Sequence, residues 1–273
     1  MRKLLFILSV ILFSGVISVS CKKGEDDPFL SFRSRKARFS GDWTITMLDK
    51  RETITQGGTS VIVETEIEEE GVTEITTSGS FRETRLGRMD IGHYQFKKDG
   101  DFSYTYQITI IENWRDTVYW NSPTEYHYRD TTLTETRIFT ASGTWNFLGN
   151  VDEYKNKERV ILNFLKTNSE VELNYFIENR ISEDPPNDPP FETVTNNTEI
   201  ERTLSSQNYT EGGKTEIWRL TKLRNKEINA KTNYMNVITT TNEQGFSDIL
   251  KEEGNFTIIL EQADGGGGDD DDD

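Results

Sequence analysis

Residues 102–110 carry the feature that most constrains the fold, a strict alternation of apolar and polar side chains. Aromatic or aliphatic residues occupy every second position, and serine, threonine or glutamine occupies the positions between them. Successive side chains of a β-strand point to opposite faces of the sheet, so this segment predicts a strand with one buried face. Sheets that are buried on one face only are typically antiparallel.

Further segments with this alternation lie around Trp43, Val171, Trp218 and Phe256, and a strand that is apolar on nearly both faces lies around Val160. Short turn sequences, most of them containing glycine, separate these segments. The hairpin pattern predicts roughly ten to twelve strands in an antiparallel barrel or sandwich. No repeat and no change in composition divides this region, so we expect a single β domain.

Helical patterns are scarce. We expect a short basic helix at residues 34–39 and a second helix at residues 247–253, with a serine N-cap and Gly254 as its end. The prolines of residues 184–190 cannot lie inside a sheet and indicate an exposed connection. The basic residues 33–38 either touch lipid headgroups or form a collar across one barrel end, and the collar is the simpler interpretation.

The N-terminus has the organisation of a bacterial signal peptide. Basic residues follow Met1, an apolar run covers residues 4–19, and small residues precede Cys21, the only cysteine. The site resembles the lipobox, where a diacylglycerol is attached to the cysteine, although Ser18 stands where an aliphatic residue is usual. We predict that Cys21 carries acyl chains such as palmitate. The alternative is an ordinary signal peptide that is cut near Ser20.

The segment after the cysteine is charged and contains glycine and proline. It resembles the acidic export signal of surface lipoproteins of the Bacteroidota. The residues that carry this resemblance are Lys22, Lys23, Glu25, Asp26 and Asp27. A solvated tether is the physical alternative, and one segment can serve both roles. We therefore expect a lipid anchor in the outer membrane and a domain that faces the cell exterior, with a periplasmic domain as the alternative.

The formal net charge of −16 excludes classes of partner. An acidic surface repels nucleic acid and anionic lipid, so we expect the membrane to be reached through the N-terminal lipid and no nucleic acid to be bound. Residues 264–273 consist only of aspartate and glycine. Such a block is typically a disordered, solubilising tail, and loose binding of Ca²⁺ is the alternative.

No residue pattern indicates catalysis. The two histidines, His93 and His127, lie far apart and in no metal-binding motif, and the nucleophile motif of the serine hydrolases is missing. Carboxylates are abundant, as in residues 66–70, which we interpret as a charged strand end or loop. Glycoside hydrolysis needs two carboxylates at a fixed separation, which a sequence does not show. We predict a protein that is not an enzyme, with no cofactor and no metal.

Four short motifs occur in a fixed order along the chain. They are Gly-Asp-Trp at residues 41–43, a turn flanked by aromatic residues at 96–102, Gly-Thr-Trp-Asn-Phe at 143–147, and Ile-Trp-Arg-Leu at 217–220. Together they resemble the lipocalin-like domains of lipoproteins of the Bacteroidota.

This resemblance implies an up-and-down antiparallel barrel with a tryptophan at its closed end. It also implies that an arginine, Arg219 or Arg224, stacks on that tryptophan. Lipocalins are shorter than this chain, so residues 112–128 and 167–213 are expected to form extended hairpins or insertions. We therefore predict an all-β fold, an antiparallel lipocalin-like β-barrel with extended hairpins and one or two short helices.

Two groups of aromatic residues are candidates for binding. The first lies at the barrel end or contacts a small apolar ligand, and a packed core is the simpler interpretation: Trp43, Phe102, Tyr104, Tyr106, Trp145 and Trp218. The second lies on the predicted hairpin, where it either anchors a sugar or protein partner or packs beneath the hairpin: Trp114, Tyr119 and Trp120.

We divide the chain into a signal peptide (1–20), the lipidated cysteine and tether (21–38), a lipocalin-like β domain (39–262) and the tail (263–273). The predicted function is that of a lipid-anchored surface protein whose barrel binds a small apolar ligand or a protein partner. The alternative is an accessory subunit of an outer-membrane complex for uptake, secretion or adhesion.

Overall fold

The computed structural model describes residues 34–122, 125–149, 158–182, 192–241 and 247–263. The proline-rich connection and the Gly/Asp tail lie outside these ranges. The predicted lipidation and export residues also lie outside them: Cys21, Lys22, Lys23, Glu25, Asp26 and Asp27.

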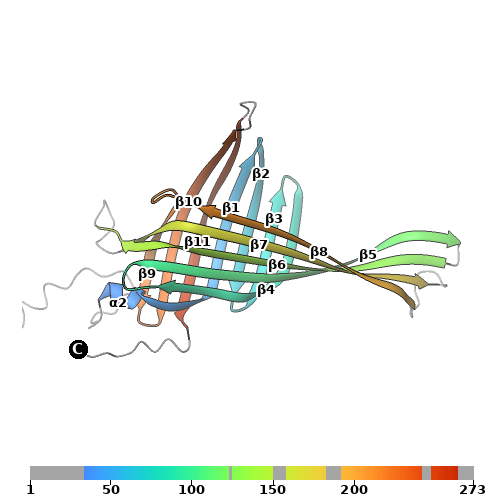
Figure 1. Cartoon of the computed structure of the whole chain (residues 1–273), viewed down its shortest axis with the longest axis horizontal. Helices are drawn as coiled ribbons and strands as arrows, with labels where there is room; N and C mark the ends of the chain where they lie inside the picture. Colours follow the sequence, from blue (N-terminus) through green and yellow to red (C-terminus); the bar gives the residue numbers. More distant parts are fainter. Residues whose placement is uncertain (1–33, 123–124, 150–157, 183–191, 242–246, 264–273) are drawn as a thin grey trace, which may run out of the picture.

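The described chain is almost entirely antiparallel β-structure, which confirms the predicted all-β fold (Figure 1). Eleven strands follow one short helix, in agreement with the predicted number of strands. The elements are α2 (Arg35–Phe39), β1 (Gly41–Gln56), β2 (Thr59–Glu68), β3 (Gly71–Ser78), β4 (Phe81–Phe96), β5 (Asp101–Ser122), β6 (Glu125–Phe147), β7 (Arg159–Ser182), β8 (Glu192–Asn208), β9 (Thr215–Arg224), β10 (Glu227–Thr241) and β11 (Ser247–Gln262).

The strands form one sheet that closes into a ring. The strand order is β6-β5-β4-β3-β2-β1-β11-β10-β9-β7-β8, and a further pairing of β6 with β7 closes it. At one end, Gly41–Thr44 of β1 pairs directly with His93–Phe96 of β4, so the β2–β3 hairpin is added only beyond this point. In the same way, Arg159–Asn163 of β7 pairs with β9, and Lys166–Ile181 pairs with β8. Without β2, β3 and β8, eight of the eleven strands form the closed base.

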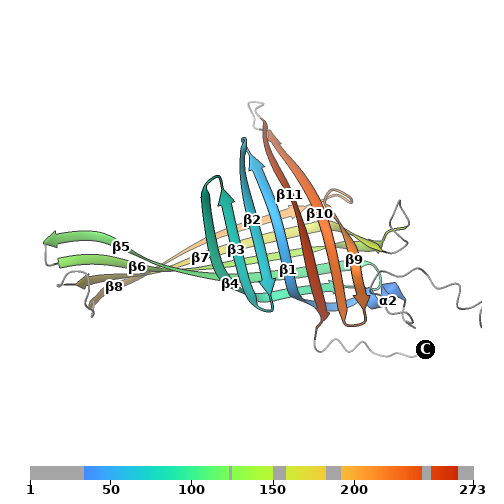
Figure 2. The same cartoon turned by 180° about the vertical axis from the view of Figure 1, so that it is seen from behind.

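Beyond the base, the ring opens into two sheets that run in steeply inclined directions (Figures 1 and 2). The long sheet consists of β5, β6, β7 and β8, and the second sheet consists of β4, β3, β2, β1, β11 and β10. Strands β6 and β7 have 23 and 24 residues, which correspond to about 75–80 Å at about 3.3 Å per residue. Their length confirms the predicted hairpins around residues 112–128 and 167–213.

Aromatic side chains fill the base, which α2 covers. Phe39 of α2 is fully buried, and its ring lies 4.4 Å from Phe96 and 4.8 Å from Trp145. Ser34 caps the helix, because its hydroxyl accepts a hydrogen bond from the backbone amide of Ala37 at 3.1 Å. The predicted short basic helix is therefore confirmed, and the packing of Phe39 explains its position across the barrel end.

The resemblance implied an arginine, Arg219 or Arg224, at the closed end, but the buried arginine there is Arg38 of α2. Arg38 is buried, and its guanidinium donates a hydrogen bond to the carbonyl of Leu223 at 2.6 Å. Arg219 follows the buried Trp218 on β9, so it points to the outer face, where it pairs with Glu158 at 3.7 Å. Arg224 is also exposed.

The predicted second helix at residues 247–253 is wrong, because these residues begin strand β11. They pair with residues 235–241 of β10 on one side, and residues 250–253 pair with the end of β1 on the other. A serine cap and a following acid are a weak local signal, and pairing with one or two neighbouring strands outweighs it.

Candidate interaction surface

The six aromatic residues that were candidates for a ligand cup pack against one another and against the rest of the core. Trp43 and Trp218 are fully buried, and Phe102 and Trp145 are nearly so. Tyr104 stacks at 4.7 Å on Tyr94. Tyr106 is partly buried against the same cluster, and burial raises its pKa to about 12.

Each of the three buried indoles has a hydrogen-bond acceptor. Trp43 donates to the carbonyl of Phe39 at 3.0 Å, and Trp145 donates to the carbonyl of Lys97 at 3.0 Å. Trp218 donates to the carboxylate of Glu216 at 3.1 Å. Buried side chains with satisfied polar groups are typical of a packed core.

A layer of polar side chains lies above this aromatic base. Tyr234 donates a hydrogen bond to Glu52 at 2.6 Å, and Lys50 pairs with the same carboxylate at 3.0 Å. Glu216 points into this layer from β9. Burial raises its pKa above the usual value, and the hydrogen bond from Trp218 and two nearby lysine charges only partly offset this.

We predict that the variant Glu216→Gln is more stable than the wild type at pH 8 and equally stable at pH 4. The glutamine keeps an oxygen that accepts from Trp218 and removes the charge that burial disfavours. An acid with a raised folded-state pKa lowers stability as the pH rises above its unfolded pKa, which is about 4.3. Thermal unfolding at the two pH values measures this.

The exposed Glu211→Gln is the matched control and should leave both melting temperatures unchanged. A pH-independent gain for Glu216→Gln, or a loss of stability at pH 8, would contradict the prediction.

An ion-pair network joins the two sheets where β4 and β5 separate. Arg85 of β4 binds Glu112 of β5 at 2.9 and 3.1 Å and also pairs with Glu135 of β6. Arg137 of β6 binds Glu74 of β3 at 2.7 Å and pairs with Glu135 as well.

Arginines bind the buried carboxylates of this network. Glu74 and Glu135 are both buried. Burial opposes the charged form of Glu135, but hydrogen bonds from Arg137 and Arg85 outweigh it and hold the pKa of Glu135 below its usual value. These carboxylates are therefore bound to arginines between two sheets, which supports a structural role for them.

The two histidines remain apart. His93 lies on β4 near Asp42, at 3.4 Å, and His127 lies on β6 near the far end of the long sheet. Within the described ranges, no group of three or more histidine, cysteine or acidic residues could hold a metal ion. No helix in the same ranges is long and apolar enough to cross a membrane. Glu68 ends β2, and Glu69 adopts a positive φ of 56° in the following turn, as expected for a strand end.

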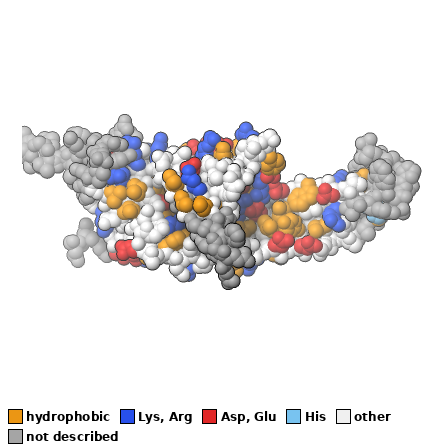
Figure 3. Space-filling model, turned by 90° about the horizontal axis from the view of Figure 1, so that it is seen from above, with side chains coloured by type: hydrophobic (Ala, Val, Ile, Leu, Met, Phe, Trp, Pro, Cys, Tyr) orange, Lys and Arg blue, Asp and Glu red, His pale blue; other side chains and the backbone are white. Residues whose placement is uncertain are grey.

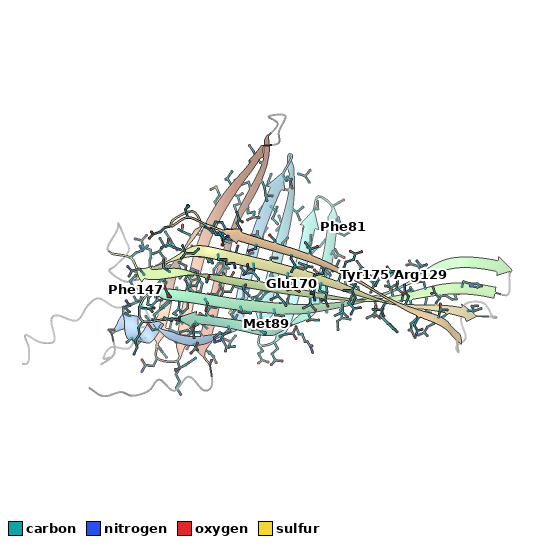
Figure 4. The ribbon with its side chains drawn as sticks, viewed as in Figure 1. Phe81, Met89, Arg129, Phe147, Glu170 and Tyr175 are labelled. Atoms are coloured by element: carbon teal, nitrogen blue, oxygen red, sulfur yellow. The ribbon has the colours of Figure 1, made fainter. Side chains whose placement is uncertain are left out.

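The long sheet carries exposed hydrophobic residues on its outer face. Figure 3 shows hydrophobic and acidic side chains next to each other where this sheet leaves the barrel. Ile111, Ile200 and Leu204 are 56%, 61% and 68% exposed, respectively. A shallow groove of about 310 Å³ crosses this face on β6, β7 and β8, lined by Ile138, Thr140, Asn168, Glu170, Leu204 and Ser206 among others. Figure 4 places Glu170 along the middle of the sheet and Tyr175 and Arg129 farther out.

The predicted interaction hairpin exists as the β5–β6 hairpin. Trp114 is 40% exposed, and its indole donates to Asp116 at 3.2 Å. Tyr119 and Trp120 belong to β5, at a place where the pairing with β6 shifts register, but their side chains lie outside the described part. Next to Trp114, Arg115 pairs with Asp130 at 2.6 Å, and this hydrogen bond lowers the pKa of Asp130.

Sequence patterns did not reveal the outer edge of β8. This strand is polar, and its apolar residues, Val194, Ile200 and Leu204, are too few and too far apart to give a clear alternation. Its exposure depends on which strands pair with it, and pairing cannot be read from composition.

Comparisons with protein-family models, curated proteins and solved structures found no match to this chain.

Proposed function

We propose that this chain is a non-enzymatic, lipid-anchored protein of the outer membrane that faces the cell exterior, and that its barrel domain is an interaction module. The position of Cys21 and the charged segment after it support the anchor. The ion-paired carboxylates and the separated histidines support a protein without catalytic activity.

One observation carries this proposal. Helix α2, the first described element after the anchor segment, covers the closed base, and the hairpin ends of the long sheet lie at the opposite end of the molecule (Figure 1). A chain tethered at its base presents the long sheet to its surroundings. The long sheet carries exposed hydrophobic residues on its outer face, and exposed hydrophobic patches typically mark sites of protein–protein interaction.

The packed base favours a protein partner over a small apolar ligand. Eight strands give a barrel just wide enough for side chains to fill or for one small ligand, and here aromatic side chains occupy the base. The eight-stranded base with a helix across its tryptophan end supports the resemblance to lipocalin-like domains. That resemblance remains part of the proposal.

The reach of the long sheet also favours a second candidate, an accessory subunit of an outer-membrane uptake, secretion or adhesion complex. Strand β5 continues for twelve residues beyond Ile110, the last residue of β5 that pairs with β4. At about 3.3 Å per residue, this is about 40 Å. Such a length suits contact with a large neighbour in the membrane.

We expect the wild type, made in its host, to incorporate radiolabelled palmitate and to be recovered with a partner after gentle detergent extraction. Cys21→Ala should lose the label, because it lacks the acceptor thiol. Recovery with an integral outer-membrane protein would select the second candidate. An unlabelled wild type would contradict the anchor, and recovery of the protein alone would contradict the interaction module.

A further inference from the structure

The outer edge of β8 is open. This strand pairs with β7 on one side, and no other strand of the described chain pairs with it. From Thr195 to Asn208, the pairing with β7 runs without a register shift, and all of these side chains are exposed. An open edge presents a row of backbone N–H and C=O groups that can pair with another strand.

Lysine, proline and β-bulges, which often protect edge strands, are missing from β8 between Thr195 and Asn208. Residues 192–208 contain no lysine and no proline, and the single irregularity in pairing lies near Asn179, toward the far end of the sheet. The free edge of β5 beyond Ile110 is interrupted by register shifts near Thr117 and Trp120. The free edge of β4, Phe81–Leu86, is short. Strand β8 is therefore the longest regular edge among these three.

The two faces of β8 differ in chemistry. On the outer face, Ile200 and Leu204 are exposed beside the groove, and Arg202 is neutralised by Glu170 and Glu172 at 3.2 and 2.5 Å. On the inner face lie Glu199 and Glu201, which have no arginine or lysine opposite them.

The residues of β7 opposite these two acids are not basic. Glu199 pairs with Tyr175, and Glu201 pairs with Leu173. The only hydrogen bond to Glu199 shown within the described chain comes from the amide of Asn197, at 3.0 Å. A strand added at the edge would bring its own side chains directly opposite both acids.

We propose that the edge of β8 binds an extended segment of a partner protein by strand addition, and that this segment alternates basic and aliphatic residues. The basic residues lie opposite Glu199 and Glu201, and the aliphatic residues lie beside Ile200 and Leu204. Main-chain hydrogen bonds supply affinity and the alternate side chains supply specificity. This inference rests on the proposed function as an interaction module and names the partner's chemistry.

Charge argues against a second copy of this chain as the occupant. An antiparallel β8–β8 pair that kept the acidic faces together and was centred near Ile200 would place glutamates opposite glutamates. Like charges directly opposite each other destabilise a strand pair.

The test is a binding titration of the full protein in mild detergent with three synthetic twelve-residue peptides. They alternate Lys with Val, Glu with Val, or contain the lysines and valines in scrambled order. We expect the Lys/Val peptide to bind at least tenfold more tightly than the other two, and to slow hydrogen exchange at amides of β8. Equal binding of all three peptides, or no binding, would overturn the proposal.

Two N-methylated versions of the Lys/Val peptide test strand addition itself. Successive amides of a strand point to opposite edges, so methylation of only the lysine amides or only the valine amides blocks one edge each. One version should lose binding and the other should keep it. If both bind or neither binds, the peptide is not an added strand.

Charge reversal tests the acids. The double variant Glu199→Lys/Glu201→Lys should prefer the Glu/Val peptide, whereas Glu66→Lys/Glu68→Lys, with the same charge change on exposed positions of β2, should behave as the wild type. An unchanged preference in the first variant would overturn the proposal. If no peptide binds but the detergent extract still yields a partner, this inference alone is rejected. If a peptide binds but the extract yields no partner, the proposed function alone is rejected. Formation of a dimer that excludes the peptide would select a second copy.

Discussion

Replacement of Arg137 with alanine is expected to lower the free energy of unfolding by about 3 kcal/mol. The change leaves Glu74 and Glu135, both buried, without their main cation. Removing one partner of a buried ion pair typically costs about 3–5 kcal/mol, and the partial exposure of Arg137 places this case at the lower end. Urea unfolding at pH 7 measures the loss.

The double variant Arg137→Met/Glu74→Leu is the matched control. It removes one cation and one anion together, so the remaining network of Arg85, Glu112 and Glu135 keeps the net charge of the original. Replacement of a buried ion pair by apolar residues is often close to neutral. We therefore expect the double variant to recover most of the stability. If the stability losses of the single variants Arg137→Met and Glu74→Leu simply added in the double variant, this result would contradict the coupling between these residues.

Replacement of Trp218 with alanine is expected to cost about 3–5 kcal/mol, the usual range for a large aromatic residue in a core. Trp218 is fully buried and lies within about 6 Å of three other rings, those of Tyr94, Phe96 and Phe256. Its removal leaves a cavity in the base and takes the hydrogen-bond donor from Glu216. Thermal and urea unfolding both report this change.

Ile217→Ala is the control, because the neighbouring residue of β9 points to the outer face and is 42% exposed. We expect it to cost less than about 1 kcal/mol. Equal losses for the two variants would mean that the alternation of inner and outer faces on β9 is assigned wrongly.

The sequence predicted the base of the barrel well. The strands at Trp43, 102–110 and Trp218 alternate with one apolar side, and this side faces the core. The strand at Val160 is apolar on nearly both faces, and its residues Val160, Leu162 and Phe164 face the core. Burial of large apolar side chains is the dominant favourable contribution to folding, so such segments can be recognised without knowledge of their neighbours.

The region where the two sheets separate could not be predicted in the same way. On β6, Glu135 is buried and Arg137 faces the same interior, whereas Ile138 lies at the groove on the outer face. Hydropathy alone would place Ile138 on the inner face and Glu135 and Arg137 on the outer face. Only the pairing with β3, β4 and β5 brings the opposite charges together, and a single sequence does not show that pairing. The open edge of β8 escaped prediction for the same reason.

Photo-crosslinking in living cells of the host tests directly whether the long sheet carries the contact surface. A photoreactive amino acid would replace Ile111 or Ile200 on the long sheet, or Ile217 on the base, all three exposed aliphatic residues. We predict crosslinks to another protein from positions 111 and 200 and none from position 217. Crosslinks from position 217 alone, or from no position, would contradict the claim that the long sheet carries the contact surface.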